Sequence, residues 1–214
     1  MRTKKGVVVL GEEEMDMQKL QELMEEYSKT LAKHAKRALN EVKGKIDNIV
    51  DDISEEFGEE TINKVQHRIK SAHSAAEKAI FYNYESLDEL TDVLGFRIIC
   101  LFQEDIENVC KAIDREFAVK KTKDYLHDPK SIDEGGYCGA IHKKIDVQCS
   151  YHGVKVIVPL EIQVTDVIAH AIWERDHAQD YKNKKRTVNK DRRAQIIEKM
   201  AALEELTGRN RENK

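Results

Sequence analysis

Proline is almost absent from this chain: two occur among 214 residues, beside ten glycines and a single tryptophan. The scarcity of helix-breaking residues favours a helix-rich chain. Hydrophobic residues make up 40% and charged residues 36% of the sequence, which is typical of a soluble globular protein. A chain of this length can bury a sizeable core, and we expect one domain with helical extensions.

Long apolar runs are also missing, because none approaches the roughly 20 residues that a membrane-spanning helix needs. The N-terminal segment MRTKKGVVVLGEEE has a short apolar run that acidic residues follow at once. We therefore expect a strand or a loose tail there rather than a signal peptide, and no membrane partner.

Cysteine is scarce and shows no CxxC spacing; the four residues are Cys100, Cys110, Cys138 and Cys149. They predict reduced, mostly buried thiols in a cytoplasmic protein. The histidines give no zinc signal either, because His170 and His177 are seven residues apart on one predicted helix, which is not a chelating spacing.

Helical periodicity dominates the N-terminal part of the chain. Apolar residues between positions 16 and 57 predict one long or two consecutive amphipathic helices, with Gly44 as the expected interruption. A further helix at about 71–82 is predicted to begin at Ser71 or Ser74, either of which can cap it. A capping box, SLDE, predicts a brief helix at residues 86–91.

Strand patterns and two helical patterns fill the rest of the chain. The predicted strands cover residues 93–102, 118–125, 140–151 and 154–164, the last two joined as a hairpin at His152-Gly153. Helices are predicted at about 104–117, from Thr165 or Asp166 to Lys182, and at 188–206. Residues 126–137 form a loop rich in Gly, Asp and Pro.

This order of elements predicts an α+β fold with a mixed, mostly antiparallel central sheet flanked by helices and with helical N- and C-terminal extensions. We expect an N-terminal helical extension at residues 1–58, a central domain at 59–185 and a C-terminal helix and tail at 186–214.

Three basic residues follow one another around the start of the predicted helix at residue 71. Arg68 and Lys70 are two residues apart and face the same way on an extended segment, while Lys78 comes one helix later. Such groups suit a polyphosphate, because each phosphate oxygen is met by a charged donor. A solvated basic surface is the alternative.

Asp92, Gly95 and Arg97 lie at and within the buried strand that follows. An arginine in so apolar a run needs a partner or a cleft, because an unpaired buried charge is costly. An internal salt bridge is the alternative to a binding role for Arg97.

Glu161 and Gln163 alternate with apolar residues on the strand VPLEIQV. Glu161 could meet Asp92 across the sheet, and two converging carboxylates repel unless a proton or a cation lies between them. With phosphate-binding groups nearby, Mg²⁺ is the natural ion, held by both carboxylates.

These stretches resemble the synthetase domain of the RelA/SpoT family, the alarmone synthetases, over roughly residues 60–185. The matching pieces follow in order: Arg68-Ile69-Lys70, Asp92 to Ile98 (DVLGFRI), Gly136-Tyr137, Glu161-Ile162-Gln163 and His177 to Lys182 (HAQDYK). The resemblance implies a nucleotidyltransferase-like fold and transfer of the β,γ-pyrophosphate of ATP to the ribose 3′-hydroxyl of GDP or GTP, making (p)ppGpp.

The resemblance also implies residue roles. Asp92 and Glu161 would be catalytic and hold Mg²⁺, and Glu161 would take the proton from the attacking hydroxyl. Arg68 and Arg97 would sandwich the adenine of ATP, while Lys70 and Lys78 would hold its phosphates. Acceptor-binding residues are expected around the glycine-rich loop and nearby elements: Tyr137, which would stack on the acceptor base, Lys130, His142, Gln163 and His177.

Two arginines of the family pattern are missing, because Cys138 and Thr165 stand in their places. This departure opens a second hypothesis: a toxin of a toxin–antitoxin pair that pyrophosphorylates the tRNA 3′ end and blocks translation. The basic runs KHAKR at 33–37 and KNKKRTVNKDRR at 182–193 could hold RNA backbone, or be solvated. A third hypothesis is an inactive nucleotide-binding module. An antitoxin partner and a homo-oligomer are both open.

Overall fold

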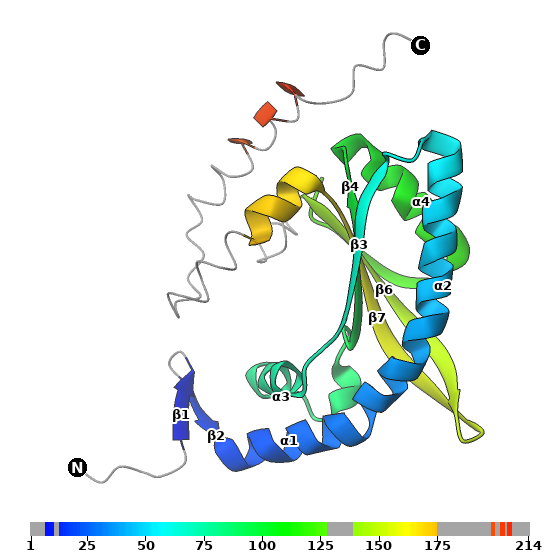
Figure 1. The fold of residues 1–214 in the computed structure, drawn as a ribbon. Helices are drawn as coiled ribbons and strands as arrows, with labels where there is room; N and C mark the ends of the chain where they lie inside the picture. Colours follow the sequence, from blue (N-terminus) through cyan, green and yellow to red (C-terminus); the bar gives the residue numbers. More distant parts are fainter. Residues whose placement is uncertain are drawn as a thin grey trace. The chain divides into compact units, whose positions relative to one another are not determined.

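The computed structural model describes residues 7–10, 13–127 and 139–174, with six residues further on (198, 199, 202, 203, 205 and 206). Figure 1 shows how its helices and strands follow one another. The chain divides into two compact units of three segments each. The first comprises Met1–Gly44, His67–Gly95 and Lys144–Glu161, and the second comprises Lys45–Gln66, Phe96–Lys143 and Ile162–Lys214.

The predicted N-terminal helical segment is confirmed as two helices, α1 (Met17–Lys29) and α2 (Leu31–Phe57). The expected interruption at Gly44 is wrong, because the helix breaks at Thr30 instead. The Thr30 hydroxyl donates to the carbonyl oxygen of Glu26 at 2.7 Å, and such bonds compete with the helical ladder and bend helices. Gly44 stays inside α2 because burial of the apolar side outweighs a glycine penalty of about 1 kcal/mol.

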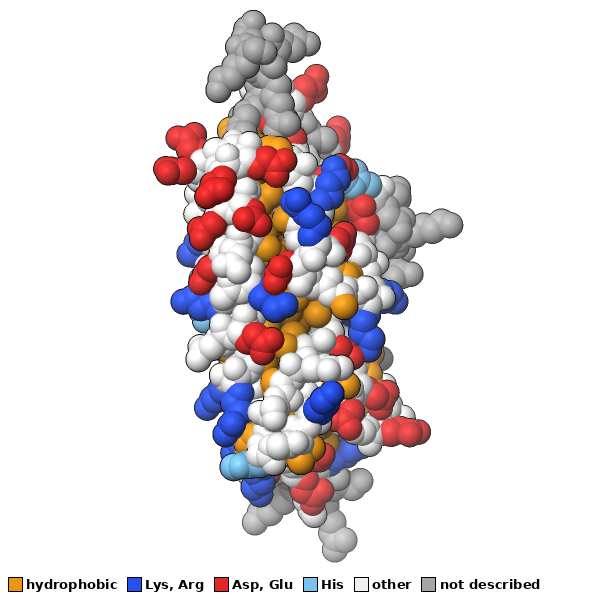
Figure 2. All heavy atoms as spheres, turned by 90° about the vertical axis from the view of Figure 1, so that its right-hand side faces the viewer, with side chains coloured by type: hydrophobic (Ala, Val, Ile, Leu, Met, Phe, Trp, Pro, Cys, Tyr) orange, Lys and Arg blue, Asp and Glu red, His pale blue; other side chains and the backbone are white. Residues whose placement is uncertain are grey.

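Helix α2 is amphipathic along its whole length. Its buried side follows three- and four-residue spacing through Leu31, Ala35, Ala38, Val42, Ile46, Ile49 and Ile53. The face that Figure 2 turns toward the viewer shows charged side chains of both signs, with hydrophobic ones in narrow strips between them. Within the described residues, no helix has both the length and the apolar character to cross a bilayer.

In the first unit, α1 packs against α3 (Ala72–Phe81). Leu20 of α1 and Ala76 of α3 form the centre of a small core, against which Leu23, Met24 and Ile80 pack. Small side chains on α3 let the two helices approach closely.

Both helix starts predicted from capping residues are confirmed. The Ser71 hydroxyl accepts the backbone N–H three residues on, at 3.2 Å, and so caps α3. Ser86 and Glu89 form the predicted capping box of the short 3₁₀ helix η1 (Leu87–Glu89). The positions of these helices therefore follow from local hydrogen bonding.

The predicted α+β fold is confirmed by a mixed five-stranded sheet with the order β3-β4-β7-β6-β5 (Figure 1). Its strands are β3 (Ile62–Ile69), β4 (Leu94–Cys100), β5 (Val119–Asp124), β6 (Ala140–Tyr151) and β7 (Val154–Asp166). The four strands predicted from β-branched and alternating residues are all present, and β3 adds a fifth, where the sequence indicated only an extended segment.

A separate antiparallel pair lies near the N-terminus, formed by β1 (Val7–Leu10) and β2 (Glu13–Asp16). The apolar run VVVL is thus a strand, one of the two predicted possibilities. β2 carries three acidic residues and has no strand signal in its sequence, so only the pairing with β1 reveals it.

The hairpin of β6 and β7 turns at His152 and Gly153, as predicted. Both residues have positive φ, 48° and 79°, as a two-residue turn of type I′ requires. Along β7, Val158, Leu160 and Ile162 are fully buried and alternate with half-buried residues. Around Glu161, one face of the strand is therefore buried and the other is half-buried.

In the second unit, η2 (Gln103–Asp105) and α4 (Ile106–Glu116) form the helix predicted at 104–117. Cys100 and Cys110 are buried there, as expected of free thiols. Burial raises the pKa of the Cys110 thiol to about 12, which makes it inert at neutral pH. Cys138 lies outside the described residues.

Residues 167–174 are helical and follow β7 directly, as predicted. The remainder of that predicted helix to Lys182 lies outside the described residues, as do the basic run 182–193 and most of the helix predicted at 188–206.

Replacing Gly44 by alanine should stabilise the protein by roughly 0.5–1 kcal/mol, because alanine is the better helix former. A β-carbon at this position of α2 would meet nothing within 4 Å. Thermal unfolding should therefore show a higher Tm. Gly153→Ala is the matched control and should lower the Tm, because its φ of 79° disfavours any side chain. An unchanged or lower Tm for Gly44→Ala would contradict the prediction.

Candidate active site

Two lysines and one carboxylate converge beside the junction of β3 and α3. Lys70 Nζ donates to Asp92 Oδ2 and Lys78 Nζ donates to Asp92 Oδ1, each at 2.8 Å. The three side chains are only 11%, 24% and 16% exposed, in the order Lys70, Lys78, Asp92. The structure thus brings together three residues that the sequence predicts for one site, while their roles stay predictions.

Local structure explains why these residues meet. Lys70 directly follows β3, and its backbone N–H donates to the carbonyl oxygen of Val93 at 2.9 Å, next to Asp92. Ser71 then starts α3, whose last turn carries Lys78. One backbone bond and one helix therefore bring both ammonium groups to the same carboxylate.

The two lysines determine the charge of Asp92. Burial alone would raise the pKa of this carboxyl, but the hydrogen bonds and the charges of Lys70 and Lys78 outweigh burial and hold its pKa below the ordinary value. Asp92 is therefore an anion at neutral pH, and the cluster carries a net charge of +1. This net charge suits a further anion such as a phosphate.

Arg68 is exposed on β3, and its stem lies against Gly95 of the neighbouring strand β4. A β-carbon at Gly95 would lie 3.5 Å from Cγ of Arg68, an ordinary van der Waals contact. The space beside Arg68 therefore does not itself require a glycine.

In the second unit, Arg97 is held by an amide, an imidazole and an indole. Its Nε and Nη2 donate to Gln163 Oε1 at 3.0 and 2.7 Å, and its Nη1 lies 3.4 Å from His170 Nδ1. The guanidinium carbon lies 3.9 Å above the Trp173 ring centre. One guanidinium face is thus covered by Trp173.

The contacts of His170 define its tautomer. Nδ1 faces the Arg97 donor, while Nε2 lies 3.3 Å from Glu174 Oε1. A proton on Nε2 satisfies both contacts, since Nδ1 then accepts from Arg97. Burial is the largest effect on His170 and lowers its pKa. The charge of Arg97 lowers this pKa further, whereas the charge of Glu174 opposes the shift. A neutral ring therefore orients Arg97 at neutral pH.

Asp166 positions the helix that carries His170 and Trp173. Its Oδ1 accepts the backbone N–H groups of Ile168 and Ala169 at 2.7 and 2.9 Å and so caps residues 167–174. Only 1% of Asp166 is exposed. Burial raises the pKa of this carboxyl above its ordinary value, although the backbone hydrogen bonds oppose the effect.

Glu161 lies half-buried on β7, the strand beside β4 in the sheet, and Asp92 lies just ahead of β4. Among the described residues, no three His, Cys, Asp or Glu side chains converge as a metal site. The hard oxygen donors of Asp92 and Glu161 nevertheless fit Mg²⁺, which usually takes one or two carboxylates together with substrate phosphates. Both oxygens of Asp92 are paired with ammonium groups in this structure, so a bound ion would share this carboxylate with the lysines.

Two of the predicted acceptor-binding residues are described, and neither is a loose surface group. Gln163 is occupied with Arg97. His142 is buried on β6, and its ring packs edge-on against Tyr125 at 4.9 Å. The other three, Lys130, Tyr137 and His177, lie outside the described residues.

Thr165, which stands where the family pattern has an arginine, is part of the interior. Its side chain is fully buried, and its hydroxyl donates to the Gly139 carbonyl oxygen at 2.8 Å. Gly139 has a φ of 77° and follows the glycine-rich loop. A short, neutral, buried donor thus occupies the position where the family pattern has an arginine.

Sequence reasoning missed three residues around these clusters. Trp173 is not among the residues predicted for the site, but the structure leaves it half-buried against Arg97. Its place three residues after His170, on the same helical face, was a usable signal. Lys144 reaches Thr91, beside Asp92, at 2.7 Å, and Tyr27 reaches the Lys70 carbonyl oxygen. No sequence pattern points to either contact.

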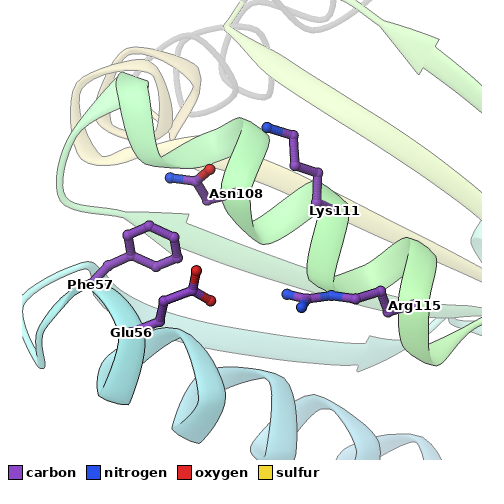
Figure 3. Close-up of a pocket in the computed structure, with 5 residues that line it drawn as sticks. All are labelled: Glu56, Phe57, Asn108, Lys111 and Arg115. Atoms are coloured by element: carbon purple, nitrogen blue, oxygen red, sulfur yellow. The ribbon is translucent and has the colours of Figure 1, made fainter.

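A pocket of about 410 Å³ lies between the end of α2 and α4 (Figure 3). It is lined by Glu56, Phe57, Asn108, Lys111 and Arg115. None of these residues is one that the sequence predicts for nucleotide binding. Lys111 and Arg115 lie one turn apart on α4, and Figure 3 shows the Arg115 side chain pointing toward Glu56 at the end of α2.

Comparison with known proteins gives the family. Residues 67–186 match the family model described as a region found in RelA / SpoT proteins. This match covers more than half of the chain, and the chain belongs to this family. It is similar to the GTP pyrophosphokinase YwaC of Bacillus subtilis (strain 168), with 28% identity over 164 residues, which are 73% of this chain and 75% of that protein.

Solved structures agree on the fold. Small alarmone synthetase 2 from Bacillus subtilis superimposes with a TM-score of 0.69 and 26% identity, covering 84% of this chain and 95% of that one. Small alarmone synthetase 1 from the same organism, bound to its product pppGpp, gives a TM-score of 0.66 at 24% identity, covering 80% and 90%. A GTP pyrophosphokinase family protein from Streptococcus pneumoniae gives 0.70 at 20% identity, covering 88% and 94%.

Asp166→Asn should raise the free energy of unfolding at pH 7, because it keeps the capping oxygen and removes a buried charge. The folded pKa of Asp166 lies above the unfolded value of about 3.9. Ionisation of Asp166 therefore lowers the stability of the wild type as the pH rises from the unfolded-state pKa through the folded-state pKa. The stability advantage of Asp166→Asn should vanish below about pH 4, where the carboxyl is protonated in both states. Urea unfolding at pH 7 and pH 3.5 measures the difference.

Asp166→Ala is the control for the cap itself, and it should lose about 0.5–2 kcal/mol through the lost cap. An Asp166→Asn variant that is less stable than the wild type at pH 7 would show that the ionised cap is favourable.

Proposed function

We propose that this chain is an ATP-dependent pyrophosphokinase that transfers the β,γ-pyrophosphate of ATP to the ribose 3′-hydroxyl of GDP or GTP, making (p)ppGpp. The observation that carries the proposal is the convergence of Lys70 and Lys78 on Asp92 at 2.8 Å. Lys70 and Asp92 match the family motifs in identity and order, and the similar YwaC of Bacillus subtilis is described as a GTP pyrophosphokinase.

The cluster suits phosphoryl-type transfer, in which positioning and charge neutralisation supply most of the rate. The ammonium groups of Lys70 and Lys78 would hold ATP phosphates. In this structure both ammonium groups are paired with the Asp92 carboxylate, which would compete with those phosphates. Mg²⁺ bound by Asp92 and Glu161 would neutralise the phosphate charge. Once a cation binds Asp92, both lysines become available to the phosphates.

The adenine of ATP would lie between guanidinium groups, as the family motifs imply for Arg68 and Arg97. Arg97 is already fixed by Gln163 and Trp173. A planar group held in one orientation loses little entropy when a base stacks on it, so the site favours the base without reorganisation. Glu161 would accept the proton of the attacking 3′-hydroxyl, provided that the ion leaves its carboxylate basic enough.

A second candidate acceptor is the tRNA 3′ end, and Thr165 favours it. Its buried hydroxyl replaces an arginine that would otherwise meet an acceptor phosphate. Around KHAKR, Arg37 lies 4.5 Å above the Tyr151 ring and His34 contacts the same ring at 5.0 Å. Cations beside aromatic rings suit RNA backbone and bases. In this case the protein would act as a toxin, with an antitoxin as its partner.

One labelled assay tests both acceptors. Purified protein receives ATP labelled at the γ-phosphate, Mg²⁺ and either GDP, GTP or deacylated tRNA, and products are separated by chromatography and gel. The proposal expects label on a guanosine nucleotide and AMP as by-product. Label on tRNA alone would assign the toxin activity. ATP binding without either product would leave a nucleotide-binding module.

Asp92→Asn should lower kcat by about 100-fold or more, because it removes a charge that acts on the transferring group. The matched control is Asp114→Asn. Asp114 accepts Lys143 Nζ through both oxygens at 2.8 Å but lies on α4, outside the cluster. The control should keep its activity. Equal losses in the two variants would show that disruption of any lysine–carboxylate pair, rather than the chemistry of Asp92, lowers the rate.

A further inference from the structure

Tyr27 links the N-terminal helix α1 to the lysine cluster. Its side chain is buried, with 1% exposed, and its hydroxyl donates to the backbone carbonyl oxygen of Lys70 at 2.8 Å. The backbone N–H of Lys70 donates in turn to Val93 at 2.9 Å. Lys70 is therefore held on both sides, by α1 through its carbonyl and by the Asp92 segment through its N–H.

The Tyr27 hydroxyl is a reliable donor. Burial, with the charge of Asp92 as a second cause, raises the pKa of Tyr27 to about 12. The phenol is therefore protonated throughout the neutral range. Separating the buried Tyr27 hydroxyl from the Lys70 carbonyl oxygen would leave both groups without a hydrogen bond, which costs free energy.

Helix α1 is itself held against the helix that carries Lys78. Leu20 of α1 and Ala76 of α3 pack together, with Leu23, Met24 and Ile80 around them. α1 thus contacts both halves of the cluster: the backbone of Lys70 through Tyr27, and α3 through its apolar side.

We propose that Tyr27 is a positioning residue for ATP binding, which fixes the Lys70 backbone so that the ammonium groups of Lys70 and Lys78 point to one place. The inference rests on the proposed function and assigns α1 to the ATP site. Tyr27 acts through Lys70 and does not itself touch the nucleotide.

Tyr27→Phe tests the hydrogen bond, because it keeps the ring and removes only the hydroxyl. We expect KM for ATP to rise about three- to tenfold, the effect of one lost hydrogen bond, with KM for the acceptor unchanged. Tyr82→Phe removes the hydroxyl of an exposed tyrosine, and Ile53→Val lowers stability in the core of α2. Both controls should keep the wild-type KM for ATP.

A double-mutant cycle shows whether Tyr27 acts through Lys70. In a Lys70→Gln background, Tyr27→Phe should have little further effect on KM for ATP, because the ammonium group that it positions is gone. The same fold-change in both backgrounds would overturn the proposal. So would a Tyr27→Phe variant that behaves like Ile53→Val, with a lower Tm and an unchanged KM for ATP.

Calorimetric titration with ATP in the absence of acceptor separates this inference from the proposed function. If the wild type binds ATP but forms no product, the proposed activity fails. The positioning role is then still supported by a Kd for ATP that is three- to tenfold higher in Tyr27→Phe. An unchanged Kd in this variant overturns the positioning role. If the wild type does not bind ATP, both proposals fall.

Discussion

The ion pairs of Asp92 are the constraint on which the first unit depends. A mostly buried carboxylate is tolerated only with partners, and here each oxygen has its own ammonium group at 2.8 Å. Removing one partner would leave a buried charge partly uncompensated, so the end of β3, the start of α3 and the segment before β4 must keep their places. The Ser71 cap, the bond from Lys70 to Val93 and the packing of α1 on α3 all serve this one position.

Arg97 shows a different solution to a charge within an apolar strand. Gln163, His170 and Trp173 hold it through an amide oxygen, a neutral ring nitrogen and an aromatic face. A planar guanidinium fixed in this way suits stacking on a base, whereas the compact ammonium groups of Lys70 and Lys78 suit phosphate oxygens. Each cluster thus solves the problem of a partly buried cation in the way that its own side-chain chemistry allows.

Elements that depend on local pattern were predictable from the sequence, and contacts between distant residues were not. Alternation gave β6 and β7, and capping residues gave the start of α3. The break at Thr30 was missed because neither a glycine nor a proline marks it in the sequence. Motif order indicated Lys70 and Asp92 as parts of one site, but the bond from Tyr27 spans 43 residues and follows no periodicity. The contact of Trp173 with Arg97 was not predictable, because a lone tryptophan suits a core as well as a cation.

At position 165, where the family pattern has an arginine, this chain has a threonine that makes a structural hydrogen bond of its own. Thr165 is buried and holds the Gly139 carbonyl, at the point where the glycine-rich loop enters β6. A threonine hydroxyl on a short, buried side chain supplies this bond without adding positive charge. Under the proposed function, position 165 would then give the acceptor no guanidinium, so the proposed acceptor site must differ from the family pattern at this position.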